Sequence, residues 1–147
     1  MNKAESDRMF MDWAWRVSER SHAERLKVGC VIEKNDSVIS YGWNGMPSGY
    51  PNRCEHEVLT MTEFGTLHLA LVSNPEVSHA EMNAYGKLAE STVSSTGASL
   101  YCTHSPCLPC AKLIQRTGTA EVVYDEQFRT DEGLYLLQKR GILVRQI

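Results

Sequence analysis

Hydrophobic residues recur along this chain at two different spacings, one typical of helices and the other of strands. Near the start, Met9, Phe10, Trp13 and Val17 follow a helical period and predict a helix over about residues 4–20. Apolar runs follow at residues 28–33 and 37–41, and the polar turn between them predicts a hairpin. The second half alternates, with helices expected at 79–90, 108–116 and 131–140 and strands at 98–102, 121–124 and 142–145.

This alternation predicts an α/β fold with partly parallel strands, formed by a single domain over residues 1–147. The segment 42–52 is dense in Gly, Pro, Asn and Ser and predicts a loop. Residues 55–73 are ambiguous and show a helical tendency over 61–71. Ser78 is the expected N-terminal cap of the helix that follows, because a serine hydroxyl can accept a bond from a free backbone N–H.

Composition and charge narrow the class of protein. The formal net charge of −3 argues against a nucleic-acid partner, although one phosphate could still bind in a local basic pocket. No apolar run reaches the length of a membrane span, and the polar start MNKAESDRMF predicts no signal peptide. Five cysteines are an odd number and two of them form a Cys-x-x-Cys motif, so we expect reduced thiols and a cytoplasmic location.

Two short motifs carry the candidate chemistry. His79-Ala80-Glu81 and Pro106-Cys107-Leu108-Pro109-Cys110 together supply one imidazole, two thiols and one carboxylate. A catalytic zinc takes three protein ligands and keeps a fourth position for water. We therefore expect His79, Cys107 and Cys110 to be zinc ligands and Glu81 to carry protons, which is the motif pattern of zinc-dependent base deaminases.

Both motifs fall at predicted helix starts, which favours the same interpretation. Free N–H groups and the positive end of the helix dipole stabilise the thiolate that zinc needs. Alternatively, Cys107 and Cys110 could form half of a structural zinc site or a redox pair. A structural site would require a fourth protein ligand, and a redox pair would need neither His79 nor Glu81.

Further segments accompany these motifs: Lys27-Val28-Gly29-Cys30-Val31-Ile32, Gly42-Trp43-Asn44-Gly45-Met46-Pro47-Ser48-Gly49, Thr103-His104-Ser105-Pro106-Cys107 and Val122-Val123-Tyr124. Taken together, the sequence resembles the cytidine deaminase superfamily, and within it the deoxycytidylate deaminase branch. The resemblance implies a three-layer fold in which helices flank a five-stranded mixed sheet. It also implies a homo-oligomer, often a hexamer.

The same resemblance implies an activity and its regulation. Members of this branch hydrolyse dCMP to dUMP and ammonia, which feeds dTMP synthesis. Many are activated by dCTP and inhibited by dTTP. The implied cofactor is Zn²⁺, with Mg²⁺ accompanying a bound triphosphate effector, and the implied partners are nucleotides rather than nucleic acid or membrane.

The resemblance also gives roles to individual residues. Glu81 would move protons between water, the base and the leaving amine. Asn44 would bind the deoxyribose, and backbone groups near Ala80 and Ser105 would read the base. The 5′-phosphate would lie near Tyr124 and the cluster Ser21, Arg25 and Lys27.

These roles have plainer alternatives. Arg25 and Lys27 could belong to a solvated charged turn, and Tyr124 could be a half-buried strand residue. The loop could form an effector site or a plain tight turn, and the residues concerned are Trp43, Gly45, Met46 and Pro47.

Two residues depart from the family pattern, and a third feature, a second zinc site, is not decided by the sequence. Trp43 stands where tyrosine is usual. His104 replaces an apolar residue, and we expect an exposed polar side chain at a strand end rather than a pH-sensitive pocket group. Some relatives hold a second, structural zinc before the His-Ala-Glu motif, where this chain has Cys54, His56 and His68. Their spacing is not diagnostic, so no second zinc site is assigned.

Several other functions compete with this interpretation. A tRNA adenosine deaminase uses the same zinc chemistry but needs a basic surface for its RNA. A riboflavin-pathway deaminase is disfavoured because no reductase domain follows. A cytidine deaminase is disfavoured because its ligand motif commonly begins with Cys rather than with His79. A catalytically silent zinc or nucleotide-binding module would have no need of Glu81.

Overall fold

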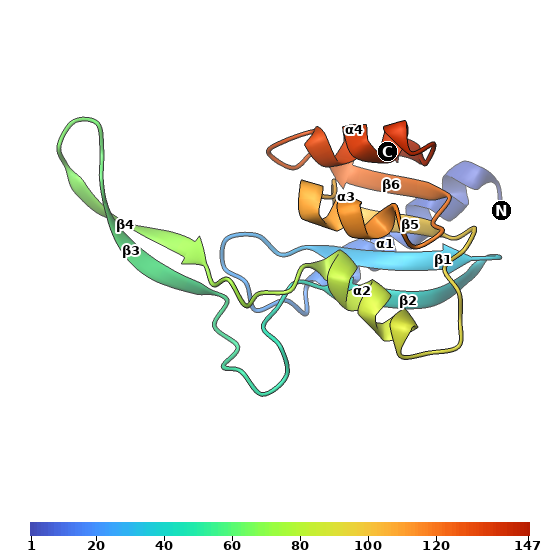
Figure 1. The fold of residues 1–147 in the computed structure, drawn as a ribbon, viewed down its shortest axis with the longest axis horizontal. Coiled ribbons are helices and arrows are strands. Elements are labelled where there is room, and N and C mark those ends of the chain that lie inside the picture. The colour runs from blue at the N-terminus through green and yellow to red at the C-terminus, as the bar shows by residue number, and fades with distance from the viewer.

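One five-stranded sheet organises the protein, whose computed structural model describes residues 1–147 (Figure 1). The strand order is β2-β1-β5-β6-β7. β1 runs antiparallel to both β2 and β5, whereas β5, β6 and β7 are parallel, so the sheet is mixed as predicted. The strands are β1 Gly29–Lys34, β2 Ser37–Trp43, β5 Ser99–His104, β6 Glu121–Glu126 and β7 Leu143–Gln146.

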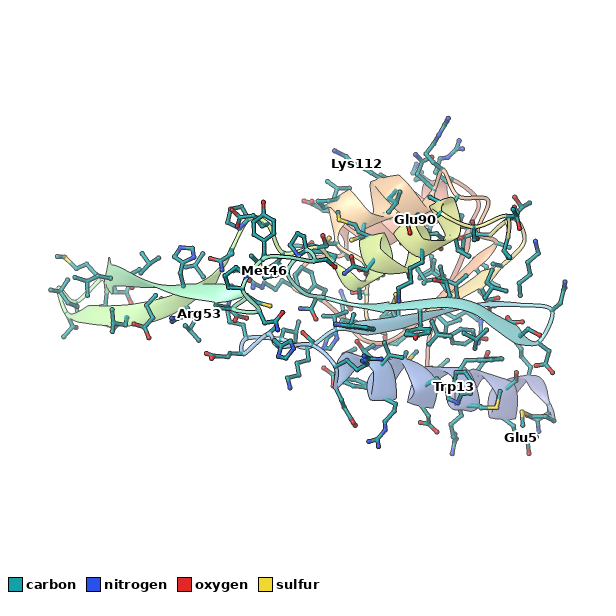
Figure 2. The ribbon with its side chains drawn as sticks, turned by 90° about the horizontal axis from the view of Figure 1, so that it is seen from below. Glu5, Trp13, Met46, Arg53, Glu90 and Lys112 are labelled. Carbon is teal, nitrogen blue, oxygen red and sulfur yellow. The ribbon has the colours of Figure 1, made fainter.

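Four helices cover the two faces of this sheet. Figure 2 shows α1, Lys3–Ser18, alone on one face, with the other helices on the opposite side. Those helices are α2 Ala80–Ala89, α3 Leu108–Ile114 and α4 Glu132–Lys139. The predicted three-layer fold class is therefore confirmed.

Both faces of the central strands are buried. Successive side chains of a strand point to opposite faces, so Val31 contributes to the layer beneath α1 while Cys30 and Ile32 contribute to the layer beneath α2. The α1 layer is completed by Phe10, Met11, Ala14, Tyr101 and Val123. The larger layer on the other side packs α2, α3 and α4 against β1, β5 and β6.

The turn between β1 and β2 explains the predicted hairpin. Asn35 and Asp36 have φ values of 53° and 62°. Asn and Asp tolerate this left-handed region better than other non-glycine residues, and two such residues in succession form the turn that suits a two-residue hairpin.

The expected cap of α2 was wrong. Ser78 does not cap the helix, because its backbone pairs with Gly45: the N–H of each donates to the carbonyl of the other, at 2.9 and 3.1 Å. His79 occupies the N-cap position, and its ring makes no capping hydrogen bond. The pairing joins the loop after β2 to the segment that leads into α2.

The helical tendency over residues 61–71 was also wrong. This region belongs to a two-stranded antiparallel hairpin, formed by β3 (Glu55–Met61) and β4 (Leu67–Ser73). Gly65 has a φ of +77° in the connecting turn, a conformation that glycine adopts without strain. Leucine at every second position of β4 then follows the strand period rather than the helical one.

The β3–β4 hairpin projects from the body of the molecule, and we call it the arm (Figure 1). Its strands pair with each other and form a separate two-stranded sheet. None of the helices combines the length and the hydropathy needed to cross a lipid bilayer.

Candidate metal centre and cleft

Two helix starts meet at the same end of the sheet, and two glycines allow the close approach. Gly42 of β2 lies directly against the carbonyl of Ala80, at the start of α2, so a side chain at position 42 would collide with it. Gly133 of α4 lies equally close to the carbonyls of Pro106 and Cys107, just before α3. These contacts fix the positions of the two motifs that supply the candidate ligands.

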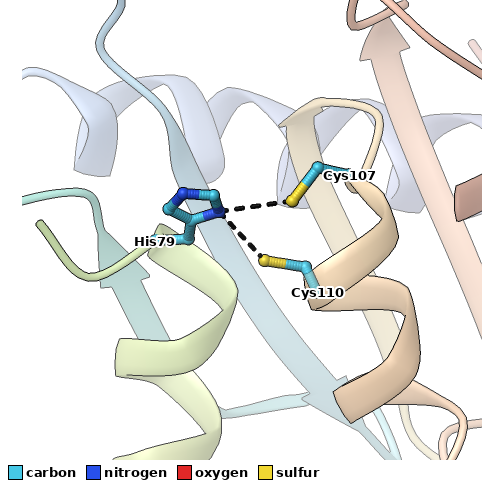
Figure 3. A group of neighbouring side chains, drawn as sticks. All are labelled: His79, Cys107 and Cys110. Carbon is cyan, nitrogen blue, oxygen red and sulfur yellow. Dashed lines mark hydrogen bonds between the residues drawn. The ribbon is translucent and has the colours of Figure 1, made fainter. Parts of the chain in front are cut away.

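His79, Cys107 and Cys110 converge between the two helices (Figure 3). Nδ1 of His79 lies 3.2 Å from Sγ of Cys110 and 3.3 Å from Sγ of Cys107. All three ligand atoms lie within 4.8 Å of one another. The structure thus brings together residues that are separated by up to 31 positions in the sequence.

The donor set fits a tetrahedral zinc ion. Zinc bonds of about 2.0 Å to nitrogen and 2.3 Å to sulfur would separate nitrogen from sulfur by about 3.5 Å. The distances in the structure are close to this value. Three protein ligands leave the fourth position for water, as in a catalytic rather than a structural site.

The two thiols differ in their electrostatic environment. A hydrogen bond from Cys110 lowers the pKa of Cys107, and the ring of His79 lowers it further. The same contact with Cys107, together with burial, raises the pKa of Cys110. One negative charge is therefore stabilised between the two sulfurs, and a bound divalent cation would favour the thiolate form of both.

Glu81 lies beside the ligands in a buried position. Its Oε2 atom is 3.4 Å from Sγ of Cys110, and the residue is 4% exposed. Burial is the largest influence and raises the pKa of this carboxyl above its usual value. A carboxyl group with a raised pKa holds a proton more readily, which suits a group that must both accept and return one.

A cleft of about 360 Å³ opens onto this group. His79, Glu81 and Cys107 line one part of it. The rest is formed by the segment before β1, the root of the arm, and the segments that follow β5 and β6; the principal residues are Arg25, Val28, Asn44, Glu55, Asn74, His104, Ser105, Phe128 and Arg129. A cleft of this size accommodates a small ligand such as a nucleotide.

Asn44 lines the cleft, but its side chain also holds the backbone nearby. Its Oδ1 accepts from the N–H of Val28 at 2.9 Å, and its Nδ2 donates to the carbonyl of Leu26 at 2.8 Å. The amide has one further donor and acceptor position for a ligand. Ser21 is buried behind it and donates to the Asn44 carbonyl at 2.8 Å, without lining the cleft itself.

The other predicted substrate residues are divided between the cleft and its surroundings. Arg25 and Ser105 line the cleft, whereas Lys27, Ala80 and Tyr124 do not. Ala80 is fully buried at the start of α2, and Tyr124 is buried within β6. The N–H of Ser105 donates to the carbonyl of Glu126, so its carbonyl is the group left for a base.

The predicted effector loop lies outside the cleft. Trp43 stacks on Tyr41 with ring centres 6.3 Å apart, and the guanidinium of Arg20 lies 4.5 Å from the centre of the Trp43 ring. Gly45 forms the bridge to Ser78 described above. None of the four predicted residues lines the cleft: Trp43, Gly45, Met46 and Pro47.

His104 is buried, so the expected exposed position was wrong. Its Nδ1 lies 2.9 Å from Oγ1 of Thr103, and its Nε2 lies 3.4 Å from a carboxylate oxygen of Glu126. The Trp15 ring packs against it at an interplanar angle of 66°, with the ring centres 5.5 Å apart. Because burial is the largest influence, the pKa of His104 is lowered, which favours the neutral ring at the cleft.

Sequence reasoning missed Phe128 and Arg129. Both line the cleft, and the guanidinium of Arg129 lies 5.6 Å from the centre of the Phe128 ring. They follow β6, whose carboxyl end lies beside that of β5 in the parallel pair. The rule that ligands bind beyond the carboxyl ends of parallel strands could have pointed to them.

The three residues considered for a second zinc do not form a ligand cluster. The triad at α2 and α3 is the one group of this kind in the chain. Cys54 is buried at the root of the arm, His56 bonds to Asn74 at 2.7 Å, and His68 bonds to Thr60.

Comparison with known proteins agrees with this geometry. The family model described as the cytidine and deoxycytidylate deaminase zinc-binding region matches residues 4–126. The chain belongs to this family. The match includes His79, Cys107, Cys110 and the loop after β2, so the resemblance noted from the sequence is confirmed.

Several relatives are named deoxycytidylate deaminases. The protein of Saccharomyces cerevisiae is 37% identical over 95% of this chain and 44% of its own length. The protein of enterobacteria phage T4 is 32% identical over 89% of this chain and 84% of its own length. This chain therefore spans less than half of the yeast relative but most of the phage one.

A solved structure matches the full length of this family member. The dCMP deaminase of cyanophage S-TIM5, crystallised with dCMP and dUMP, superposes with a TM-score of 0.86 at 38% identity, covering 100% of both chains. The matched region therefore includes both the central sheet and the arm of this chain.

Proposed function

We propose that this chain is a zinc-dependent deaminase that hydrolyses dCMP to dUMP and ammonia. One observation carries the proposal: a buried carboxyl, Glu81, lies beside a three-ligand metal centre at the end of a cleft that also contains two arginines. The names of the relatives in yeast, phage T4 and cyanophage S-TIM5 support the same substrate.

His79, Cys107 and Cys110 would hold the zinc ion, which supplies a Lewis acid and lowers the pKa of a bound water. Glu81 would take a proton from the water that adds at C4 of cytosine and deliver it to N3. Glu81 would then take the remaining hydroxyl proton and deliver it to the leaving amine. One water is consumed, the C4–N bond breaks, and the carboxylate returns to its starting form.

Arg25 and Arg129 would bind the 5′-phosphate at the other part of the cleft. Guanidinium groups form paired, charge-assisted hydrogen bonds with phosphate oxygens. Asn44 would use its remaining donor and acceptor for the deoxyribose, and Phe128 would pack against the sugar or base. Lys27, Ser21 and Tyr124 would act from behind or beside the cleft, since they do not line it.

The same residues argue against an RNA substrate. Two arginines suffice for a single phosphate, whereas an RNA stem-loop needs a basic surface along its backbone. The formal net charge of this chain is −3. A free nucleotide is therefore the substrate that the charge distribution favours.

The test measures ammonia release by the zinc-loaded protein from dCMP, deoxycytidine and a tRNA anticodon stem-loop. We expect turnover of dCMP, with kcat/KM for deoxycytidine lower by at least about 100-fold because the phosphate contacts are lost. Inosine formation in the stem-loop without turnover of dCMP would contradict the proposal. One zinc per chain without any turnover would instead favour a silent binding module.

Two arginine variants separate phosphate recognition from general effects of charge. Arg25→Ala and Arg129→Ala should each raise the KM for dCMP by about 10- to 100-fold and leave deoxycytidine turnover nearly unchanged. Arg16→Ala is the matched control, since Arg16 lies on the exposed face of α1 and pairs with Glu19. Equal effects of all three variants would remove both arginines from the phosphate site.

We further propose that the loop after β2 responds to dCTP as activator and dTTP as inhibitor, with Mg²⁺ on the triphosphate. The link from Gly45 to Ser78 would carry the response to His79, one residue away. Nucleotide-dependent changes in dCMP turnover that vanish in Trp43→Ala would support this. An unchanged response in that variant would place the effector elsewhere.

Through the deamination of dCMP the enzyme would supply dUMP for dTMP synthesis.

A further inference from the structure

The two faces of the arm differ in polarity. Residues directly opposite each other in the hairpin share a face, and one face is formed by the pairs Glu57–Leu71, Leu59–Leu69 and Met61–Leu67. The other face is formed by the pairs His56–Val72, Val58–Ala70 and Thr60–His68. Four large apolar side chains of the first face are 60–68% exposed, namely Leu59, Met61, Leu67 and Leu69. We call this first face the leucine face.

Nothing within the chain covers the leucine face. The arm forms its own two-stranded sheet and projects from the body (Figure 1). A two-stranded hairpin alone is marginally stable in water and gains stability when an apolar face is packed. Phe64 at the tip is 87% exposed, which extends the apolar surface.

The exposed surface has the size of one half of an interface. Its apolar side chains present roughly 500 Å² on each arm, near the upper limit for the largest patch of an ordinary monomer. Two such faces packed together would bury about 1,000 Å², the lower limit for a specific interface. Two-fold packing would cover both faces at once, because each copy presents the same patch.

Charge on the arm decides between a second copy and a lipid surface. Residues 54–73 contain three glutamates and neither lysine nor arginine. Segments that bind anionic membranes carry basic residues beside their apolar ones. The three pairs that form the leucine face contain one charged residue, Glu57, which lies opposite Leu71 at the end nearer the root, and the four exposed apolar side chains lie beyond it toward the tip.

We propose that the leucine face is a self-association surface, on which the arms of two copies of this chain pack face to face. Facing sheets lie about 10 Å apart, which places Leu69 of one copy near the same face of the other. The arm thus completes its core only in the assembled protein. This assignment is independent of the substrate, because the leucine face lies outside the cleft.

Sedimentation equilibrium of the full, zinc-loaded chain tests the proposal with a matched pair of variants. Leu59→Thr/Leu69→Thr changes one opposed pair on the leucine face, and Val58→Thr/Ala70→Thr changes the adjacent pair on the other face. Threonine suits strands, so both variants should keep the hairpin and the zinc content. We expect the leucine pair to weaken association at least about 100-fold and the control pair less than about 3-fold.

Cross-linking gives a second, geometric readout. Leu69→Cys and Ala70→Cys are treated with a bismaleimide that spans about 10 Å, the separation of packed sheets. Of the native thiols, four are buried and the fifth, Cys107, belongs to the metal centre. We expect covalent dimers from Leu69→Cys and few from Ala70→Cys.

Four results would overturn the proposal. The unmodified protein could remain monomeric at 100 times the concentration at which it is assayed, the two double variants could associate equally, or the two cysteine variants could cross-link equally. Flotation of the monomer with phosphatidylcholine vesicles, lost in Leu59→Thr/Leu69→Thr, would reassign the face to a lipid surface and also overturn it.

Discussion

The metal centre and the arm differ in how many parts of the fold hold them in place. At the metal centre, packing from several directions fixes each group: Gly42 and Gly133 admit two helix starts, and Glu81 is buried between them. Beyond its root, the arm has no neighbouring strand except within the hairpin itself, and large side chains remain exposed. Substitutions should therefore affect chemistry and stability strongly at the metal centre, and mainly association in the arm.

The largest expected effect is on catalysis at Glu81. Glu81→Gln should reduce kcat for dCMP by about 1,000-fold or more, because the amide cannot carry protons. Zinc content, measured by atomic absorption, should remain at one ion per chain, since Glu81 is not one of the three ligands. A variant that retains a tenth of the activity would show that another group moves the protons.

The next effect compares two glycines. Gly133→Val should lower the free energy of unfolding by about 3 kcal/mol and reduce zinc affinity, because the new side chain meets the carbonyls of Pro106 and Cys107. Gly65→Ala in the arm faces open space but has a φ of +77°, so it should cost only about 1 kcal/mol and leave zinc affinity unchanged. Urea unfolding and zinc titration measure both. Equal loss of zinc affinity would contradict the separation of the two regions.

The third effect concerns the free energy of unfolding at low pH, which depends on a residue outside the arm. Burial alone would raise the pKa of Asp7, but hydrogen bonds from Arg145, Tyr101 and Lys3 lower it to about 2. Because the folded carboxyl has the lower pKa, its stabilisation is complete above about pH 4 and is lost as the pH falls toward 2. Asp7→Asn should lower the free energy of unfolding at pH 7 by about 2 kcal/mol and flatten its dependence between pH 4 and 2.

Asp12→Asn is the control for this acid effect, because Asp12 lies on the exposed side of the same helix. Its unfolding free energy should follow that of the unmodified protein at every pH. If Asp7→Asn left the loss of unfolding free energy between pH 4 and 2 unchanged, other carboxyls, such as Glu121, would be responsible for that loss.

The smallest effect is expected for the arm in dilute protein. Leu69→Thr should change the free energy of unfolding by less than about 0.5 kcal/mol when association is negligible, since Leu69 is 64% exposed. Urea unfolding at the lowest measurable protein concentration checks this. A cost of 2 kcal/mol or more would mean that the arm packs against the body of its own chain.

The same contrast explains what the sequence could predict. The ligand motifs are local signals, and helices such as α1 bury one face against a continuous core, so their periodicity is clear. The arm was missed because Leu, Met and Glu favour helices by composition, while the turn at Gly65 was the decisive signal. The apolar side chains that alternate along the arm also do not face a core, and a core-facing pattern is what usually identifies a strand.

Long-range contacts account for the remaining differences between the structure and what the sequence predicted. His104 is buried because Trp15, from a helix almost ninety residues earlier, packs against it. Arg129 reaches the cleft because β5 and β6 are parallel neighbours. Local sequence patterns contain neither of these pairings, so the burial of His104 and the role of Arg129 emerge only from the assembled sheet.

The root of the arm has a consequence for how this domain can vary in length. Oε1 of Glu55 accepts from the backbone N–H groups of Glu24 and Arg25 at 3.0 and 3.2 Å, and Asn74 closes the other side by donating to the carbonyl of Cys54 at 2.7 Å. At the arm, the boundary of the cleft is therefore formed by the two end residues of the hairpin and the residues next to them, Cys54, Glu55, Ser73 and Asn74. We therefore expect that the chain between residues 56 and 72, which does not line the cleft, can be shortened, extended or replaced by a fused module while the cleft keeps its shape.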